Sequence, residues 1–278
     1  MLHLGSLDRF VIENRLWVIS SLVGVSIYDF DFRQYFDCRT PYENPKGISA
    51  IARVGAFDDY SEFYKECSDI GIDLVNSPEQ HYRCTSLQLW YPLISELTPR
   101  SAWFKTIPSF EELESFGLPV FVKGDRQTSK HSAEACIVRN RSDYERVATI
   151  FKSDPILNWQ DFVCRELLEL RKVSGGVKGK MPASFEFRTF WWRGKLVGDG
   201  RYWFESDPYS WTDAERTKAL HLAELAVKRL DCPFVVIDLA QTIAGEWVII
   251  ECNDGMESGY AGASPFSIWQ KILNIESS

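Results

Sequence analysis

The sequence lacks the short motifs that mark several large enzyme classes. It contains no GxxxxGK[ST], GxGxxG, HExxH or GxSxG segment, and its four histidines are scattered along the chain. Phosphate-binding P-loops, dinucleotide-binding βαβ units, zinc proteases and α/β-hydrolases each depend on one of these arrangements. These enzyme classes therefore have no support in the sequence.

Positive charge, paired cysteines and long apolar runs are also scarce. The net charge of −8 argues against a protein that neutralises a nucleic-acid backbone over a broad face. The seven cysteines form no CxxC pair, and no apolar run approaches membrane-spanning length. The opening residues, MLHLGSLDRFVIENR, carry charges too early for a secretory signal. We therefore expect a cytoplasmic protein that binds neither nucleic acid nor membrane, and we leave a homodimer open.

The first hundred residues predict a mixture of strands and helices. The 278-residue chain is long enough to bury a large core. The expected strands are 16–22, 48–54 and 72–75, and the expected helices are 58–70 and 85–97. The aromatic, charged segment 29–46 fits neither period and predicts a loop or a short irregular strand. Its Arg33 and Arg39 are either surface residues or substrate contacts.

Residues 102–182 also predict strands and helices that alternate along the chain. Ser109 with Glu112 predicts a capped helix over 111–116, and Ser142 with Glu145 predicts another over 142–151. The expected strands are 102–107, 120–123, 133–138 and 159–163, the last continuing towards residue 170. The glycine-rich, basic segment KVSGGVKGKMP has no side chains that form a core, so it predicts a mobile loop that closes over bound ligands.

A hairpin over 183–203, with Gly194 in its turn, precedes a long helix that Thr212 and Glu215 cap. A last helix is expected over 265–275. If Arg193 and Gly194 form the turn of the hairpin, the pairing places Arg201 opposite Glu186 and Asp199 opposite Arg188.

A second hairpin joins the apolar runs 234–239 and 247–252. A turn at Gly245 puts Asp238 opposite Glu251, and Asn253 shares the face of Glu251. Two facing carboxylates repel unless a cation lies between them, and an oxygen-only set of ligands suits Mg²⁺. We expect the removal of one carboxylate to relieve this repulsion and to leave the unliganded fold intact. The alternative is an ordinary polar turn at the end of a hairpin.

Three cations lie upstream of these acids. Lys123 ends an apolar strand and opens a polar loop, 124–132, that contains Lys130. Arg188 lies on the first hairpin, and a guanidinium suits two-pronged contact with phosphate. Each cation taken alone is more simply a surface residue. Cations upstream and carboxylates downstream together make the division of labour that polyphosphate chemistry needs.

These segments, in this order, resemble the clade of ATP-grasp proteins named for one arginine and two lysines. The resemblance covers residues 101–275 and rests on LPVFVKG with Lys130 downstream, VCRELLEL, FEFRTFWWRGKLVGDGRYW, FVVIDLA and IIECNDGMESGYAGASP. It implies an α+β fold in which two subdomains clasp ATP. A small α/β domain, residues 1–100, would precede the ATP-grasp domain, residues 101–278.

The resemblance also implies roles for single residues. Lys123 and Lys130 would contact the phosphates, and Arg188 would contact the terminal phosphate or the transition state. Arg201 and Gly259 would lie near the acceptor. From these implied roles, we expect Arg188, Arg201 and Lys130 to serve catalysis. Magnesium would be held by Asp238, Glu251 and Asn253.

The adenine-binding segment has two candidates, 160–163 and 165–168. The second is favoured, which places Glu166, Leu167 and Leu168 at the nucleotide. Glu166 and Glu169 are alternatives for binding the ribose. Lys105 is either the interdomain lysine of other ATP-grasp enzymes or an exposed strand residue.

The expected activity is that of an ATP- and Mg²⁺-dependent ligase. It would join a carboxylate of a small molecule or peptide to an amine through an acylphosphate and release ADP and phosphate. A kinase-like phosphotransferase and a non-catalytic ATP-binding module are the alternatives.

Overall fold

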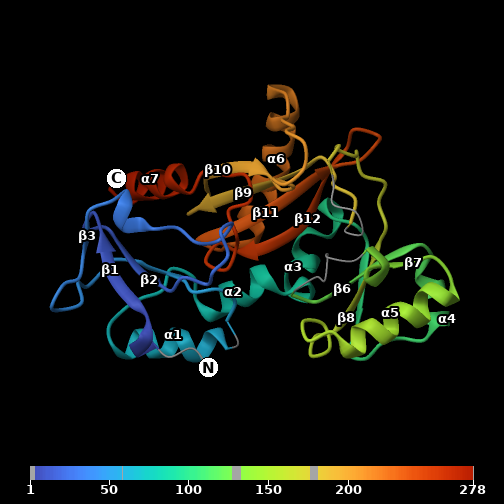
Figure 1. Ribbon diagram of the computed structural model, residues 1–278, viewed down its shortest axis with the longest axis horizontal. Coiled ribbons are helices and arrows are strands. Elements are labelled where there is room, and N and C mark those ends of the chain that lie inside the picture. Colours follow the sequence, from blue (N-terminus) through green and yellow to red (C-terminus); the bar gives the residue numbers. More distant parts are fainter. Residues whose placement is uncertain (1–3, 58, 127–132, 176–180, 278) are drawn as a thin grey trace.

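The computed structural model describes residues 4–57, 59–126, 133–175 and 181–277. Within these ranges, three four-stranded sheets and seven α-helices follow one another along the chain (Figure 1). This confirms the predicted α+β class. Lys130 and residues 176–180 of the predicted mobile loop lie outside the described residues.

The N-terminal sheet has the strand order β3-β1-β2-β4. Its strands are β1 (Asp8–Ile12), β2 (Leu16–Ser20), β3 (Cys38–Arg39) and β4 (Ala50–Arg53). Strand β1, which the sequence pattern missed, forms a hairpin with β2 through Glu13 and Asn14, whose φ angles are 50° and 53°. This turn contains no glycine or proline from which it could be predicted. Arg33 and Arg39 form exposed ion pairs with neighbouring aspartates.

Helices α1 (Tyr60–Asp69), α2 (Pro78–Thr85) and α3 (Leu87–Ile94) follow this sheet. The helix predicted over 85–97 corresponds to α3 and the 3₁₀ turn Ser95–Leu97 that follows it, whereas α2 was not predicted. Ser77 starts α2 with a complete capping box, and Ser86, with φ −88° and ψ 122°, separates α2 from α3. The predicted helix therefore begins at Leu87 and not at Thr85, because the extended Ser86 interrupts the helical hydrogen bonding.

The second sheet has the order β5-β8-β6-β7 and carries two helices (Figure 1). Its elements are β5 (Ser101–Phe104), α4 (Phe110–Phe116), β6 (Val120–Gly124), β7 (Ile137–Val138), α5 (Arg141–Ser153) and β8 (Phe162–Glu166). The capping box of Ser109 and Glu112 is confirmed. The one predicted at Ser142 is wrong, because Asn140 caps α5 by accepting from the backbone of Asp143.

The central sheet is antiparallel throughout and has the order β10-β9-β11-β12. Its elements are β9 (Glu186–Trp192), β10 (Lys195–Arg201), α6 (Asp213–Leu230), β11 (Phe234–Gln241), β12 (Trp247–Asp254) and the C-terminal α7 (Pro265–Glu276). The capping box of Thr212 and Glu215 is confirmed. Residues of α6 cover one face of this sheet, while α7 and the N-terminal sheet pack against the other.

Bulges decide which side chains share a face. Asp238 lies opposite Glu251 as predicted, although a register shift directly after Asp238 displaces the remaining pairs of β11 and β12 by one residue. A similar shift between Leu196 and Gly198 places Arg201 opposite Phe187 and Asp199 opposite Thr189. The predicted pairs of this first hairpin are therefore wrong, because one extra residue turns every later side chain to the other face.

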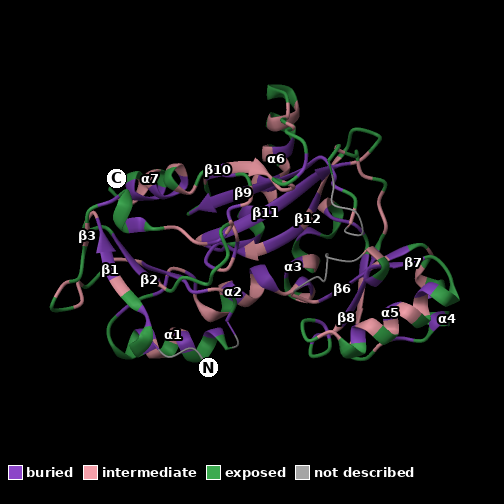
Figure 2. Cartoon of the chain, viewed as in Figure 1, coloured by how far each residue is buried: buried purple, intermediate pink, exposed green. Residues whose placement is uncertain are grey.

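One hydrophobic core joins the N-terminal sheet to the central sheet. It brings Ile19 and Ile51 together with Trp192, Phe234 and residues of α7 such as Trp269. Figure 2 shows the strands of the central sheet as mostly buried, whereas α4 and α5 expose much of their surface. None of the described helices combines the length and apolar character needed to cross a membrane.

Candidate functional site

A row of charged side chains crosses the central sheet on the face turned away from α6. Arg188 of β9 pairs with Asp238 of β11, which pairs in turn with Glu251 of β12. Flanking residues of this face, such as Phe190 and Val236, belong to the core shared with the N-terminal sheet. The row therefore lies where the apolar packing of this face gives way to polar side chains.

Arg188 and Asp238 form a buried, two-pronged ion pair. Arg188 Nε and Nη2 donate to the two carboxylate oxygens at 2.8 and 2.7 Å, and Nη1 donates to the carbonyl of Gly259 at 2.9 Å. Burial favours the uncharged form of Arg188, but the charge and hydrogen bonds of Asp238 outweigh it and raise the pKa of Arg188. The guanidinium is therefore held charged and in a fixed orientation.

Lys123 reaches Glu251 from the second sheet. Lys123 is the penultimate residue of β6, its side chain is 3% exposed, and its Nζ lies 2.5 Å from Oε1 of Glu251. Both predicted metal-binding carboxylates thus have a cationic partner. The expectation that Asp238 and Glu251 repel each other without compensation is wrong, because cations from β9 and β6 neutralise them.

A cavity of about 670 Å³ opens beside Lys123 and Glu251. Apolar and polar residues line this cavity, among them Phe121, Ile137, Met181 and the segment 165–170, which begins at the end of β8 and continues beyond it. Glu166, Leu167 and Leu168 all line this cavity, whereas none of residues 160–163 does. Of the two candidate adenine segments, the second is the one placed at this cavity.

Gln160, from the disfavoured segment, supports the loop after β6 instead. Its Oε1 accepts from the backbone of Arg126 at 2.8 Å. A Cβ at Gly124 would lie 2.5 Å from the Gln160 amide group, so a larger residue there would displace this amide from its present position. The described start of the loop is thereby fixed next to Lys123.

Arg165 holds the floor of the same cavity. Its guanidinium donates to the carbonyl of Ile250 at 2.6 Å and to the hydroxyls of Thr98 and Ser101 at 2.7 and 3.1 Å. Burial lowers the pKa of Arg165 to about 10, although Glu251 opposes the effect. Arg165 thus ties β8 to β12 beneath the Lys123–Glu251 pair.

A second cavity of about 280 Å³ lies on the other side of Glu251. Arg188 and Tyr202 line it, together with Asn253, Arg126 and Glu257. The sequence reasoning missed Arg126 and Glu257, although Arg126 is a cation at the start of the polar loop that was already singled out. Arg126 lies 3.6 Å from Glu257, so this cavity carries both signs of charge at one edge.

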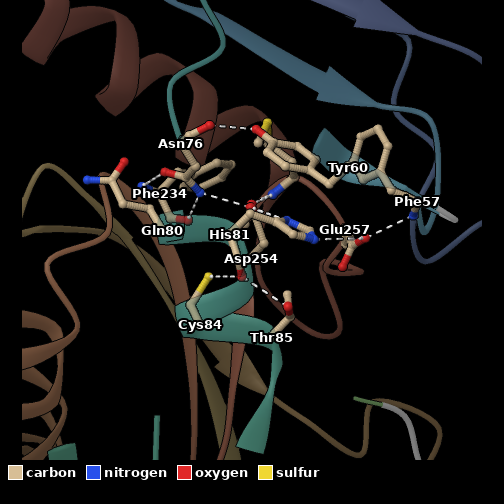
Figure 3. A network of polar contacts seen from close by, with 12 residues as sticks. Phe57, Tyr60, Asn76, Gln80, His81, Cys84, Thr85, Phe234, Asp254 and Glu257 are labelled. Atoms are coloured by element: carbon tan, nitrogen blue, oxygen red, sulfur yellow. Dashed lines mark hydrogen bonds and ion pairs between the residues drawn. The ribbon is translucent and has the colours of Figure 1, made fainter. Parts of the chain in front are cut away.

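A buried polar network fixes the end of β12 behind this cavity (Figure 3). Asp254 accepts from Asn76 at 2.9 Å and lies at the same distance from Nδ1 of His81, and none of these three side chains is exposed. Glu257 lies 3.9 Å from Nε2 of His81. Burial raises the pKa of Glu257, while His81 counteracts the effect. Residues of α2 and the segment before it therefore hold the turn that follows Asn253.

Arg53 of β4 holds the next part of that turn. Its guanidinium donates to the carbonyls of Gly255 and Ser258 at 2.9 and 2.8 Å and to that of Tyr28 at 3.1 Å. It also lies 3.9 Å from the ring centroid of Tyr28. The N-terminal sheet thus shapes the segment whose Gly259 carbonyl accepts from Arg188.

Two of the predicted residues lie away from this centre. Lys105 is 83% exposed, pairs with Asp161 at 2.7 Å and does not line the 670 Å³ cavity. Lys105 directly follows β5 and extends into solvent. Arg201 lies on the face of β10 opposite to Arg188 and lines a separate cavity.

The magnesium ligands suggested by the sequence are partly available. Glu251 and Asn253 line the 280 Å³ cavity, whereas Asp238 is fully buried and directs both oxygens to Arg188. Within the described ranges, no group of three or more histidine, cysteine, aspartate or glutamate side chains is arranged to hold a metal. A hard cation bound here would depend on Glu251, Asn253 and oxygens of the substrate.

Comparison with solved structures shows the same fold. A RimK domain ATP-grasp protein from Sphaerobacter thermophilus has a TM-score of 0.57 at 13% identity, over 83% of this chain and 81% of that one. D-alanine–D-alanine ligase from Bacillus anthracis, complexed with ATP, gives 0.59 at 14%, over 82% and 78%. The ATP-grasp ligase PsnB, complexed with precursor peptide PsnA2 and AMPPNP, gives 0.52 at 12%, over 82% and 77%.

The sequence also matches a known family. No curated protein matches the chain significantly. The matching family is described as an ATP-grasp domain, family 3 of the clade named for one arginine and two lysines. The match spans residues 112–272, which is more than half of the chain and includes every element of the charged row. The chain therefore belongs to family 3 of this clade of ATP-grasp proteins.

Proposed function

We propose that this protein is an ATP- and Mg²⁺-dependent ligase that joins a carboxylate to an amine through an acylphosphate. The observation that carries the proposal is the row of Arg188, Asp238 and Glu251, which Lys123 meets at the mouth of a 670 Å³ cavity. Residues 101–278 would form the ATP-grasp domain, and residues 1–100 would form the preceding domain that shapes its acceptor side.

ATP would place its base in the 670 Å³ cavity and its phosphates at Lys123. Leu167 and Leu168 offer an apolar surface and backbone groups to the adenine, and Glu166 would bind the ribose. This direction is supported by charge, because Glu251, the ion-pair partner of Lys123, lines both the 670 Å³ and the 280 Å³ cavity. Lys130, in the loop that begins at Gly124, would join Lys123 at the phosphates. The exposed Lys105 would contribute through Asp161 to the position of β8.

Magnesium would be held by Glu251 and Asn253 together with phosphate oxygens. Asp238 completes the oxygen set proposed for the metal, which requires it to exchange its present partner, Arg188. When bound, the metal supplies positive charge to the phosphates during transfer. In such an exchange the metal would compensate the carboxylates, and Lys123 and Arg188 would be available to the phosphate oxygens.

Arg188 would carry the transfer step. An acceptor carboxylate oxygen attacks the terminal phosphorus as the bond to the ADP oxygen breaks, and the negative charge needs a fixed, planar donor. Arg188 already contacts the second cavity, where Arg126 would draw the acceptor carboxylate. The amine nitrogen then attacks the acyl carbon, phosphate leaves and the nitrogen loses its proton. Arg201 would hold a more distant part of the acceptor.

The test combines binding with product analysis. Saturating Mg·ATP is expected to raise the melting temperature, and an unchanged melting temperature would overturn the nucleotide site. Given a carboxylate and an amine, the products are expected to be ADP and phosphate. Hydroxylamine in place of the amine is expected to trap a hydroxamate. A stable phosphorylated product would establish a phosphotransferase instead, and release of AMP would contradict both reactions.

A further inference from the structure

A cavity of about 630 Å³ lies next to Arg201 of β10. Its walls are aromatic, with Phe187, Phe204, Tyr209 and Trp211, and its remaining lining includes residues 261–264 before α7. The rings of Phe187 and Trp211 stack at 3.8 Å with an angle of 14° between their planes. The cavity therefore offers flat apolar surface beside a cation.

This cavity neighbours the proposed reaction centre through residues that line more than one cavity. The 280 Å³ cavity shares Arg188 and Tyr202 with a smaller one of about 170 Å³. That smaller cavity shares Phe204 and Ala261 with the 630 Å³ cavity. The three cavities thus follow one another from Arg188, past Tyr202 and Phe204, to Arg201, and this is the course on which an elongated acceptor would lie.

The uncompensated charge at the 630 Å³ cavity is positive. Asp199 also lines the 630 Å³ cavity, but it is neutralised by Arg216 of α6 at 2.6 Å. Arg201 donates to the carbonyl of Phe204 at 3.3 Å, which is a long and neutral contact. Among the described residues that line this cavity, the Arg201 guanidinium therefore stands as the uncompensated charge, within a protein whose net charge is −8.

Close packing of the backbone fixes the position of Arg201. A Cβ at Gly200 would lie 2.2 Å from the backbone nitrogen of Ala263, and a Cβ at Gly262 would lie 2.8 Å from the carbonyl oxygen of Arg201. The amide of Gly262 donates to that same oxygen at 3.0 Å. The two glycines let segment 261–263 lie directly on β10, so Arg201 projects from a rigid support.

Resting on the proposed function, we propose that the acceptor is an elongated molecule with two anionic groups, of the class of short acidic peptides. One carboxylate reacts beside Arg188, and a second anionic group binds Arg201. Between them, an apolar or aromatic part packs against Phe204 and Trp211. The succession of three neighbouring cavities, with Arg188 at one end and the Arg201 guanidinium at the other, supports this choice over a small amino acid.

Calorimetric titration with two matched peptides tests the proposal. The probes are acetyl-Glu-Tyr-Ala and acetyl-Gln-Tyr-Ala, each added to the full chain saturated with Mg·AMPPNP. We expect the acidic peptide to bind about tenfold to a hundredfold more tightly, as for the gain of one charge-assisted hydrogen bond. Arg201→Gln is expected to abolish this difference. Lys195→Gln, which removes an exposed charge from the same strand, is expected to preserve it.

The outcomes separate this inference from the proposed function. If Mg·AMPPNP binds but the acidic peptide does not, or if its advantage persists in Arg201→Gln, the acceptor assignment is overturned. If Mg·AMPPNP itself does not bind, the proposed function fails and this inference fails with it. Arg201→Lys keeps the charge and is expected to retain most of the preference. A complete loss of the preference in a folded Arg201→Lys protein would also contradict a site for a second anion.

Discussion

Asp238→Asn is expected to destabilise the protein strongly even without ligands. The substitution keeps the shape of the side chain but removes the charge that compensates Arg188. Asp238 is fully buried and Arg188 is 11% exposed, so water cannot replace the lost partner. Two hydrogen bonds, at 2.8 and 2.7 Å, lose their ionic acceptor at the same time. The single variant therefore contains a buried, uncompensated guanidinium.

The expected cost is about 3–5 kcal/mol, the range found when one partner of a buried ion pair is removed. For a chain of this size, each 1 kcal/mol lowers the melting temperature by roughly 2–4 °C, so the expected fall is about 6–20 °C. Asp8→Asn is the matched control. Its ion pair with Arg33 is about half exposed, and we expect a loss of at most about 1 kcal/mol.

The double variant Arg188→Met with Asp238→Leu distinguishes lost charge from lost packing. Replacing both members of a buried pair with apolar residues is often neutral or stabilising, so the double variant is expected to recover most of the stability. Thermal and denaturant unfolding of the four proteins measure these differences. If Asp238→Asn costs no more than Asp8→Asn, or if the double variant is less stable than the single one, the charge argument is refuted.

Three further predictions concern catalysis, the phosphate loop and thiol chemistry. Arg188→Lys is expected to keep most ATP binding and to lower kcat by about a hundredfold or more, because an ammonium lacks the planar pair of donors; an unchanged kcat would exclude Arg188 from the transfer step. Asp125, at the start of the phosphate loop, accepts from the backbone of Gln88 at 3.0 Å and from the hydroxyl of Ser86 at 2.6 Å. Asp125→Ala is therefore expected to lower the free energy of unfolding by about 1 kcal/mol and to raise KM for ATP. Asp125→Asn keeps an acceptor and is expected to change both less. A loss of stability with no change in KM would show that Asp125 does not position the loop for ATP binding. Partial burial raises the pKa of Cys38 to about 11. Its reaction with a disulfide reagent at pH 8 is therefore expected to be about tenfold slower than that of a free thiol, because the smaller thiolate fraction is only partly offset by greater nucleophilicity, and to accelerate as the pH rises towards 11. A rate equal to that of a free thiol would contradict the raised pKa.

Local patterns in the sequence predicted much of the fold. Ser109 and Thr212 start helices with the capping boxes expected of them, and Gly194 and Gly245 lie in hairpin turns. These features depend on residues within a few positions of one another, which is why a single sequence reveals them. The pairing of Asp238 with Glu251 was also within reach, because it lies on the side of the bulge where the predicted register holds.

Bulges, and contacts between residues far apart in the chain, could not be predicted from the sequence. The shift between Leu196 and Gly198 moves Arg201 to the other face of the sheet, yet no proline or unusual spacing marks it. Lys123 meets Glu251 across 128 positions of the chain, and His81 meets Asp254 across 173. Packing between separate sheets creates these pairs, so the charge balance of the site follows from tertiary structure and not from any short motif.

The core between the N-terminal sheet and the central sheet limits how this chain can be recombined. Ile19 and Ile51 belong to the same packed cluster as Trp192, Phe234 and Trp269, so a cut near residue 100 would leave large apolar side chains exposed on both fragments. An exchange of the first hundred residues for those of another protein would have to match these side chains in shape and also replace the Arg53 contacts to the turn after β12. Changes in acceptor preference should therefore arise more readily by substitution within the present N-terminal sheet than by its replacement as a module.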